Sequence, residues 1–175
     1  IPLVSARREV ELVKTRIDAV AAAVKNDQGV DFTYRLGVMV ETPRAALRAE
    51  DIASQAAFLS FGTNDLTQMA YGLSRDDAGR FMSSYVKLGV YPEDPFHTLD
   101  IEGVGELLKI GAQRGRQARP DIVLSLCGEH GGSPEAIEFC RDAGFDYVSC
   151  SPFRVPVARL AAAQIALTAR LGKQT

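Results

Sequence analysis

The sequence contains no tryptophan, only three cysteines and two histidines, and no long apolar run. A bilayer-spanning helix needs about 20 consecutive apolar residues, so a membrane protein is not expected. The lysines and arginines are dispersed and the formal net charge is −2. A nucleic-acid-binding protein would need a concentrated basic face, so no nucleic-acid partner is expected.

The odd number of cysteines excludes a simple disulfide framework. The spacing of Cys127, Cys140 and Cys150 does not fit a zinc site either. Reduced thiols in a cytoplasmic protein are the simpler interpretation. Cys140 lies at core spacing in a predicted helix and Cys150 ends a predicted strand, so we assign both to packing.

The first four residues, IPLV, are apolar and are followed at once by a charged helical pattern. They lack the cationic flank and cleavage site of a signal peptide. We interpret them as a strand cut at its beginning, and the chain as a piece of a longer protein.

Short apolar runs alternate along the chain with longer amphipathic stretches, which is typical of βα units and a parallel sheet. Strands are predicted at residues 1–4, 34–40, 57–61, 122–126 and 145–150, and helices at residues 9–24, 43–53, 101–119, 134–144 and 157–171. Residues 62–99 are predicted to be a long irregular region with a helix near 66–71. Stretches of this length inside a domain are usually functional.

Five strands in series with helices between them are compatible with two architectures. One is a doubly wound sheet, and the other is about half of a (β/α)8 barrel, which typically needs about 250 residues. The pattern alone leaves both open.

Polar residues directly follow four of the predicted strands. They are Glu41, the run 62–65 (GTND), the run 127–132 (CGEHGG) and the run 151–154 (SPFR). In both parallel architectures the active site forms at the carboxyl ends of the strands. We therefore expect these segments to converge on one mouth.

Glu41 and Asp65 place two carboxylates on neighbouring strand ends, and such hard oxygen ligands suit Mg²⁺. The alternative for Glu41 is an acid favoured near a helix start. The closely spaced backbone N–H groups of Gly62, Thr63, Asn64 and Asp65 could cradle a phosphate or carboxylate. An ordinary loop of turn-forming residues is the alternative there.

Cys127 follows a buried-looking strand, where most cysteines are small core residues. Its position at the predicted mouth makes it a candidate proton donor, since an ordinary thiol with a pKa of about 8.5 stays protonated at neutral pH. His130 could orient a ligand or bond to the backbone, and Arg154 could contact an anion or brace a loop. We assign His97 a structural role.

Three motifs carry a family resemblance. Residues 41–47 (ETPRAAL), 58–68 (FLSFGTNDLTQ) and 127–132 (CGEHGG) resemble motifs of the phosphoenolpyruvate-utilising enzymes. Residues 74–79 (SRDDAG), the HGG of 130–132, and residues 148–156 (VSCSPFRVP) with 158–164 (ARLAAAQ) are similar to the pyruvate, phosphate dikinase branch. The resemblance covers essentially the whole chain.

This resemblance implies a fold and an activity. Residues 1–175 would form the C-terminal half of the phosphoenolpyruvate/pyruvate-binding barrel. The family converts ATP, pyruvate and phosphate into AMP, phosphoenolpyruvate and diphosphate, and a phosphohistidine on another domain carries the phosphoryl group. Glu41 and Asp65 would hold Mg²⁺, residues 62–65 would line the substrate, and Cys127 would move the proton at the methyl carbon.

The departures from the family pattern also matter. The substrate-binding arginines of earlier barrel strands, the nucleotide-binding domain and the phosphohistidine domain have no counterpart in these residues, and Thr42 replaces a more usual apolar residue. The chain is therefore expected to be inactive alone, and its partners would be the remaining domains and a second copy. Two alternatives stay open: a non-catalytic dimerisation module, and a phosphoenolpyruvate synthase-type barrel.

Overall fold

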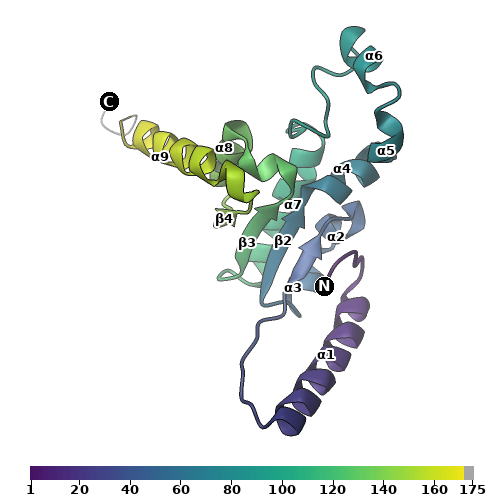
Figure 1. Ribbon diagram of the computed structural model, residues 1–175, viewed down its shortest axis with the longest axis vertical. Coiled ribbons are helices and arrows are strands. Elements are labelled where there is room, and N and C mark those ends of the chain that lie inside the picture. The colour runs from purple at the N-terminus through teal and green to yellow at the C-terminus, as the bar shows by residue number, and fades with distance from the viewer. Residues whose placement is uncertain (172–175) are drawn as a thin grey trace.

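The computed structural model of the protein describes residues 1–171, and its elements follow one another in βα order (Figure 1). The strands are β1 Val38–Val40, β2 Phe58–Gly62, β3 Val123–Cys127 and β4 Tyr147–Val148. The helices are α1 Arg7–Gln28, α2 Pro43–Leu47, α3 Ala49–Ala53, α4 Thr63–Tyr71, α5 Arg75–Ala78, α6 Met82–Lys87, α7 Val104–Ala118, α8 Pro134–Asp142 and α9 Val155–Leu171, with 3₁₀ turns η1 Glu129–Gly132 and η2 Pro152–Arg154. Within the described residues, the helices are too short or too polar to cross a membrane.

The strands form one parallel sheet in the order β1-β2-β3-β4. The register places Val40 opposite Phe61 and Gly62 opposite Cys127. Because all four strands run the same way, their carboxyl ends lie along one edge of the sheet. The predicted α/β class with parallel βα repeats is confirmed.

One predicted strand is absent, the strands predicted at 34–40 and 145–150 shorten to 38–40 and 147–148, and one predicted helix is divided. Residues 1–4 form no strand, although Ile1 extends the sheet edge: its amino group donates to the Gly37 carbonyl (2.7 Å) and its carbonyl accepts from the Met39 N–H (2.8 Å). Leu3 then adopts a positive φ of 51°, which turns the chain away from the edge. The helix predicted over 43–53 is divided into α2 and α3, because Arg48 has non-helical angles (φ −116°, ψ 23°).

Side-chain caps start three helices where the sequence predicts them. The Thr42 hydroxyl accepts from the Ala45 N–H (3.0 Å), and Ser133 caps α8 in the same way with a proline at its first position. The Asp100 carboxylate accepts from the first N–H groups of α7, including that of Val104 (3.1 Å). Each cap satisfies donors that have no partner inside the helix.

The two faces of the sheet differ. Leu59 and Phe61 are fully buried and point to α7, where a side chain on Gly111 or Gly115 would collide with them. These glycines allow the helix to approach the sheet closely. Alternate residues on the opposite face, such as Ser60, are only partly buried. A doubly wound sheet carries helices on both faces, so a sheet with its helix layer on one face fits a segment of barrel wall.

The long region predicted as irregular contains more helix than expected. It begins with α4 and continues as an arm, which we define as residues 72–99. The arm includes α5 and α6 and projects from the carboxyl edge of the sheet (Figure 1). A small apolar cluster around Ala78, Met82 and Phe96 packs the arm on itself, separate from the main core.

Candidate functional site

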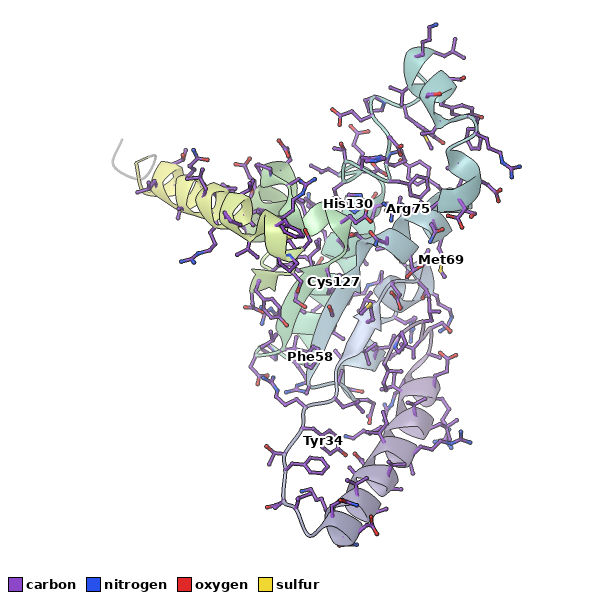
Figure 2. All side chains as sticks on the ribbon, viewed as in Figure 1. Tyr34, Phe58, Met69, Arg75, Cys127 and His130 are labelled. Carbon is purple, nitrogen blue, oxygen red and sulfur yellow. The ribbon has the colours of Figure 1, made fainter. Side chains whose placement is uncertain are left out.

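The strand ends bring the predicted site residues together at the carboxyl edge of the sheet. Glu41 directly follows β1, Gly62 ends β2, and Cys127 ends β3. In Figure 2 Cys127 lies at this edge, whereas Phe58 marks the opposite end of β2. Three of the four segments that were expected to converge therefore meet at this edge.

The Glu41 carboxylate lies over Gly62. It is 4% exposed, and its Oε1 accepts a hydrogen bond from the Leu3 N–H (2.8 Å). A Cβ on Gly62 would come within 2.7 Å of Oε2. Glycine at this position thus makes room for the acid.

Burial raises the pKa of Glu41 above its ordinary value, and the neighbouring Asp65 carboxylate adds to this effect, while the bond from Leu3 opposes it. Asp65 stands in the first turn of α4, and its Oδ1 accepts from the Gln68 amide (3.1 Å). Two carboxylates are therefore close enough to interact at this edge. Such a pair disfavours full ionisation unless a cation or proton lies between them.

The Cys127 thiol lies on the partly buried face of the sheet. Its Sγ is 3.3 Å from the Ser60 hydroxyl, 3.4 Å from the Phe61 carbonyl and 4.0 Å from the Met39 sulfur. Burial raises the pKa of Cys127, the Glu41 charge raises it further, and the Ser60 hydroxyl lowers it. The thiol therefore keeps its proton at neutral pH and can donate it.

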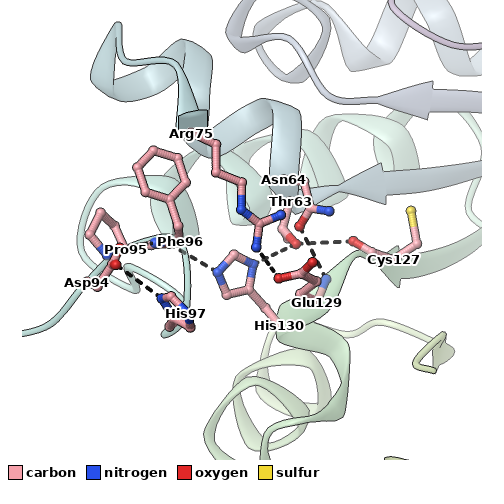
Figure 3. A network of polar contacts seen from close by, with 10 residues as sticks. All are labelled: Thr63, Asn64, Arg75, Asp94, Pro95, Phe96, His97, Cys127, Glu129 and His130. Carbon is pink, nitrogen blue, oxygen red and sulfur yellow. Dashed lines mark hydrogen bonds and ion pairs between the residues drawn. The ribbon is translucent and has the colours of Figure 1, made fainter. Parts of the chain in front are cut away.

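The backbone of Cys127 faces a second set of residues, drawn in Figure 3. Thr63 Oγ1 lies 3.1 Å from the Cys127 carbonyl and 2.8 Å from His130 Nδ1. Asn64 Oδ1 accepts from the Glu129 N–H (3.2 Å). Thr63 and Asn64 thus hold the turn after β3 against the start of α4.

The structure shows the surroundings of His130 and Arg154, whose roles the sequence left open, and of His97. His130 is buried and bonds to both a side chain and a backbone carbonyl, that of Pro95. Arg154 lies against Gly132, where a Cβ would come within 2.9 Å of its side chain. His97 is exposed on the arm and pairs with Asp94 (3.1 Å), which fits a structural role.

Sequence reasoning missed one residue at this edge. Arg75, at the start of α5, forms an ion pair with Glu129 across 54 positions of sequence. No periodicity signals such a contact. The sequence shows only that Arg75 is a cation in the motif at residues 74–79, within the region predicted to be irregular.

Metal-binding side chains are sparse. Among residues 1–171, no group of three or more histidine, cysteine, aspartate and glutamate side chains converges in a way that could hold an ion. The pair Glu41 and Asp65 still matches the needs of Mg²⁺, which usually takes one or two carboxylates and completes its shell with water and substrate oxygens. These two carboxylates suit a Mg²⁺ ion whose remaining ligands are water and substrate oxygens. They are too few to form a site made of protein ligands alone.

Comparison with known proteins decides the family. The family model described as "PEP-utilising enzyme, PEP-binding domain" matches residues 1–167. The chain belongs to this family. As a member of the phosphoenolpyruvate-utilising enzymes, it corresponds to their phosphoenolpyruvate-binding domain.

Two similar proteins carry the same name. Pyruvate, phosphate dikinase of Rhizobium meliloti (strain 1021) is 56% identical over 170 residues, which is 97% of this chain and 19% of that protein. The enzyme of the same name from Clostridium symbiosum is 56% identical over 167 residues, 95% of this chain and 19% of that protein. The chain thus spans about a fifth of the length of the curated relatives it matches.

The fold also has a structural relative. A citrate lyase from Burkholderia xenovorans LB400 superposes with a TM-score of 0.58 at 17% sequence identity, over 99% of this chain and 54% of that one. At this identity the likeness concerns the fold alone. It agrees with a barrel-type arrangement of parallel βα repeats of which this chain supplies a part.

Proposed function

We propose that the chain is the second half of the phosphoenolpyruvate/pyruvate-binding barrel of a pyruvate, phosphate dikinase, and that its site handles pyruvate and its enolate. The observation that carries this proposal is the grouping of two interacting carboxylates and a protonated thiol on three consecutive strand ends. The similarity to pyruvate, phosphate dikinases over nearly the whole chain supports it.

In this proposal Glu41 and Asp65 hold Mg²⁺, and residues 62–65 line the substrate. A bound Mg²⁺ supplies positive charge that stabilises negative charge developing on an enolate oxygen. Gly62 leaves the space beside Glu41 Oε2 unfilled, because a Cβ there would come within 2.7 Å of that oxygen. Thr63 and Asn64 hold the opposite side of the turn in place.

Cys127 donates a proton to the methyl carbon of pyruvate in one direction and removes it in the other. When phosphoenolpyruvate loses its phosphoryl group, the thiol S–H bond breaks and the proton goes to the methylene carbon, which gives pyruvate. In the reverse direction the thiolate removes a methyl proton and the enolate oxygen attacks the phosphohistidine in line. The raised pKa of Cys127 favours the protonated resting form that the first direction needs.

The rest of the reaction requires domains outside these residues. We infer partner domains that bind ATP and carry the phosphohistidine, a homodimeric assembly and a cytoplasmic location. Alone, the half barrel is expected to be inactive because the arginines expected on earlier strands belong to the other half.

The test uses the full-length dikinase that carries this segment. Exchange of the pyruvate methyl protons with solvent deuterium, followed by ¹H NMR in the presence of Mg²⁺, reports the proton step alone. Cys127→Ala should abolish exchange, whereas Cys150→Ala, which removes another thiol near the same edge, should preserve it. Exchange that survives Cys127→Ala would refute the proton role.

The metal role has its own test. Titration calorimetry with Mg²⁺ and oxalate, a mimic of the enolate, should show binding that Glu41→Ala and Asp65→Ala each reduce by at least about tenfold. Asp77→Ala, which removes an exposed acid from the arm, is the matched control and should bind normally. Equal affinity in all variants would contradict the assignment of Glu41 and Asp65.

A non-catalytic assembly module is the second candidate, and one observation favours it. Large apolar side chains stand exposed near the C-terminal end, with Phe153 at 94%, Leu160 at 61% and Leu167 at 58% exposure. A surface of this kind suits contact with another chain or domain. Dimerisation without any Mg²⁺-dependent oxalate binding would favour this second function.

A further inference from the structure

Both ring nitrogens of His130 have hydrogen-bond partners. It lies in η1, three residues after Cys127, and is 1% exposed. Nε2 lies 3.1 Å from the Pro95 carbonyl and Nδ1 lies 2.8 Å from Thr63 Oγ1. A carbonyl oxygen can only accept, so Nε2 carries a proton.

The protonation of the other nitrogen follows from burial. Burial lowers the pKa of His130, the nearby Arg75 and His97 side chains lower it further, and the hydrogen bond to the Pro95 carbonyl and the Glu129 carboxylate raise it. The ring is therefore neutral near pH 7, with its proton on Nε2 and a lone pair on Nδ1. Nδ1 must then accept the hydrogen bond from the Thr63 hydroxyl.

The Thr63 hydroxyl has a single proton but two acceptors within reach. One is His130 Nδ1 at 2.8 Å and the other is the Cys127 carbonyl at 3.1 Å. In Figure 3 the Cys127 carbonyl points to Thr63 while its thiol points away from it. The two acceptors compete for this proton, so the side chain at position 130 decides whether the hydroxyl can donate to the peptide carbonyl of Cys127.

The turn between Cys127 and His130 has little freedom to adjust. Gly128 has φ +115°, and a Cβ there would lie 2.5 Å from Thr63 Oγ1 and 3.1 Å from Asn64 Oδ1. The turn thus packs tightly on the start of α4. A change at His130 is transmitted through Thr63 to the backbone that carries the thiol.

The arm meets the same turn through two contacts. Arg75, near its beginning, pairs with Glu129, and the Pro95 carbonyl, near its end, accepts from His130. Both ends of residues 72–99 are therefore fastened to consecutive residues of η1. Figure 2 shows Arg75 and His130 near one another above Cys127.

We propose that His130 is a positioning residue for the Cys127 thiol, acting from Nδ1 through the Thr63 hydroxyl, while Nε2 separately fastens the arm at Pro95. This inference rests on the proposed proton role of Cys127. It adds a residue that touches neither substrate nor metal, and it predicts that the two ring nitrogens have separable effects.

Two substitutions separate the nitrogens. His130→Asn places an amide atom where Nδ1 stands and loses the reach to Pro95, whereas His130→Gln reaches toward Pro95 and loses the partner of Thr63. In the full-length enzyme, pyruvate methyl exchange should keep its KM for pyruvate in both variants. The exchange kcat should fall by at least about tenfold in His130→Gln and stay within about threefold of the unsubstituted enzyme in His130→Asn.

A readout that needs no turnover accompanies the kinetics. The rate of Cys127 alkylation by iodoacetamide at one fixed pH, followed by peptide mass spectrometry to separate it from Cys140 and Cys150, should change in His130→Gln and not in His130→Asn. His97→Gln, on the exposed side of the arm, is the matched control and should leave both readouts unchanged.

Thr63→Val removes the hydroxyl while keeping the shape of the side chain. It therefore tests the same contact if the histidine variants fold poorly. It removes the proton for which His130 Nδ1 and the Cys127 carbonyl compete, so His130→Gln should cause no further change in alkylation when it is added to Thr63→Val. Equal alkylation and exchange in the two histidine variants, or additive effects with Thr63→Val, would overturn the proposal. If the unsubstituted enzyme does not exchange the pyruvate methyl protons at all, the proposed function is wrong. The alkylation comparison would still decide the role of His130.

Discussion

The Ser60 hydroxyl lies 3.3 Å from the Cys127 thiol and donates toward its sulfur from the neighbouring strand. The two residues face each other across the β2–β3 pair, where Ser60 is aligned with Ser125 and Cys127 with Gly62. The Ser60 hydrogen bond lowers the pKa of Cys127, whereas the Glu41 carboxylate raises it. Burial has the largest effect on the pKa of Cys127, and these two side chains adjust it in ways that can be removed one at a time.

Replacing Ser60 by alanine should raise the pKa of Cys127 further, because a hydrogen bond that favours the thiolate is lost. At neutral pH the fraction of thiolate falls, so iodoacetamide should alkylate Cys127 several-fold more slowly. Ser60→Thr, which keeps the hydroxyl, is the matched control. Faster alkylation in the alanine variant would show that the contact does not stabilise the thiolate.

Replacing Glu41 by glutamine should act in the opposite direction. The neutral amide removes a negative charge near Cys127 while leaving the burial of the thiol nearly unchanged, so the pKa of Cys127 falls. Alkylation at neutral pH should then be faster than in the unsubstituted chain. A slower reaction would mean that the carboxylate is neutral or that its charge does not reach the sulfur.

Stability should depend on pH through His130. Its folded-state pKa is lowered by burial, so the unfolded chain binds a proton that the folded chain does not as the pH falls through about 6.5. The free energy of unfolding should therefore drop between about pH 7 and pH 5.5. Urea denaturation at both pH values measures this drop.

The His130→Gln variant supplies the control for that slope. Glutamine does not titrate, so the part of the pH dependence that comes from residue 130 should disappear in the variant. An unchanged slope would assign the effect to other groups.

Adding a methyl group at Gly111 should destabilise the fold. Its Cβ would lie 2.7 Å from the buried ring of Phe61, which is also packed edge-on against Phe145. Overpacking of this kind costs about 1–3 kcal/mol, against a gain in helix propensity of up to about 1 kcal/mol. Gly79→Ala is the control, since nothing lies within 4 Å of its Cβ position and its φ is −55°, and it should be neutral or stabilising.

The isolated chain should associate with itself. Strands β1 and β4 end the sheet, β4 has only two residues, and Ile1 pairs with only a short part of the β1 edge, so both edges of a half barrel are largely open to pairing. Light scattering after size exclusion should give a mass that rises with concentration. A single monomer mass over the whole range would contradict this prediction.

A pair of variants locates the associating surface. Leu160→Glu on the exposed side of α9 should reduce the association if this apolar surface contributes beside the strand edges, whereas Leu88→Glu, at a more exposed leucine on the arm, should leave it unchanged. Equal behaviour of the two variants would point to the strand edges instead.

Much of the site could be read from local sequence because its chemistry sits at strand ends. Apolar runs followed directly by polar residues predicted where β1, β2 and β3 end. The same pattern predicted that Glu41, Asp65 and Cys127 lie at one edge of the sheet. The roles assigned to those residues remain predictions. Strand limits were less well predicted, since β4 has two of six expected residues and residues 1–4 form none.

The sequence by itself determined the order of the βα units, the capped starts of α2, α7 and α8, and the family motifs, because all of these depend on residues close together in the chain. Tertiary structure alone decided that the helices cover one face of the sheet, that Arg75 meets Glu129, and that His130 joins Thr63 to Pro95. Those contacts join residues 35 to 67 positions apart. They exist only where packing of the strands and the arm brings distant segments together, and no local period of the sequence encodes them.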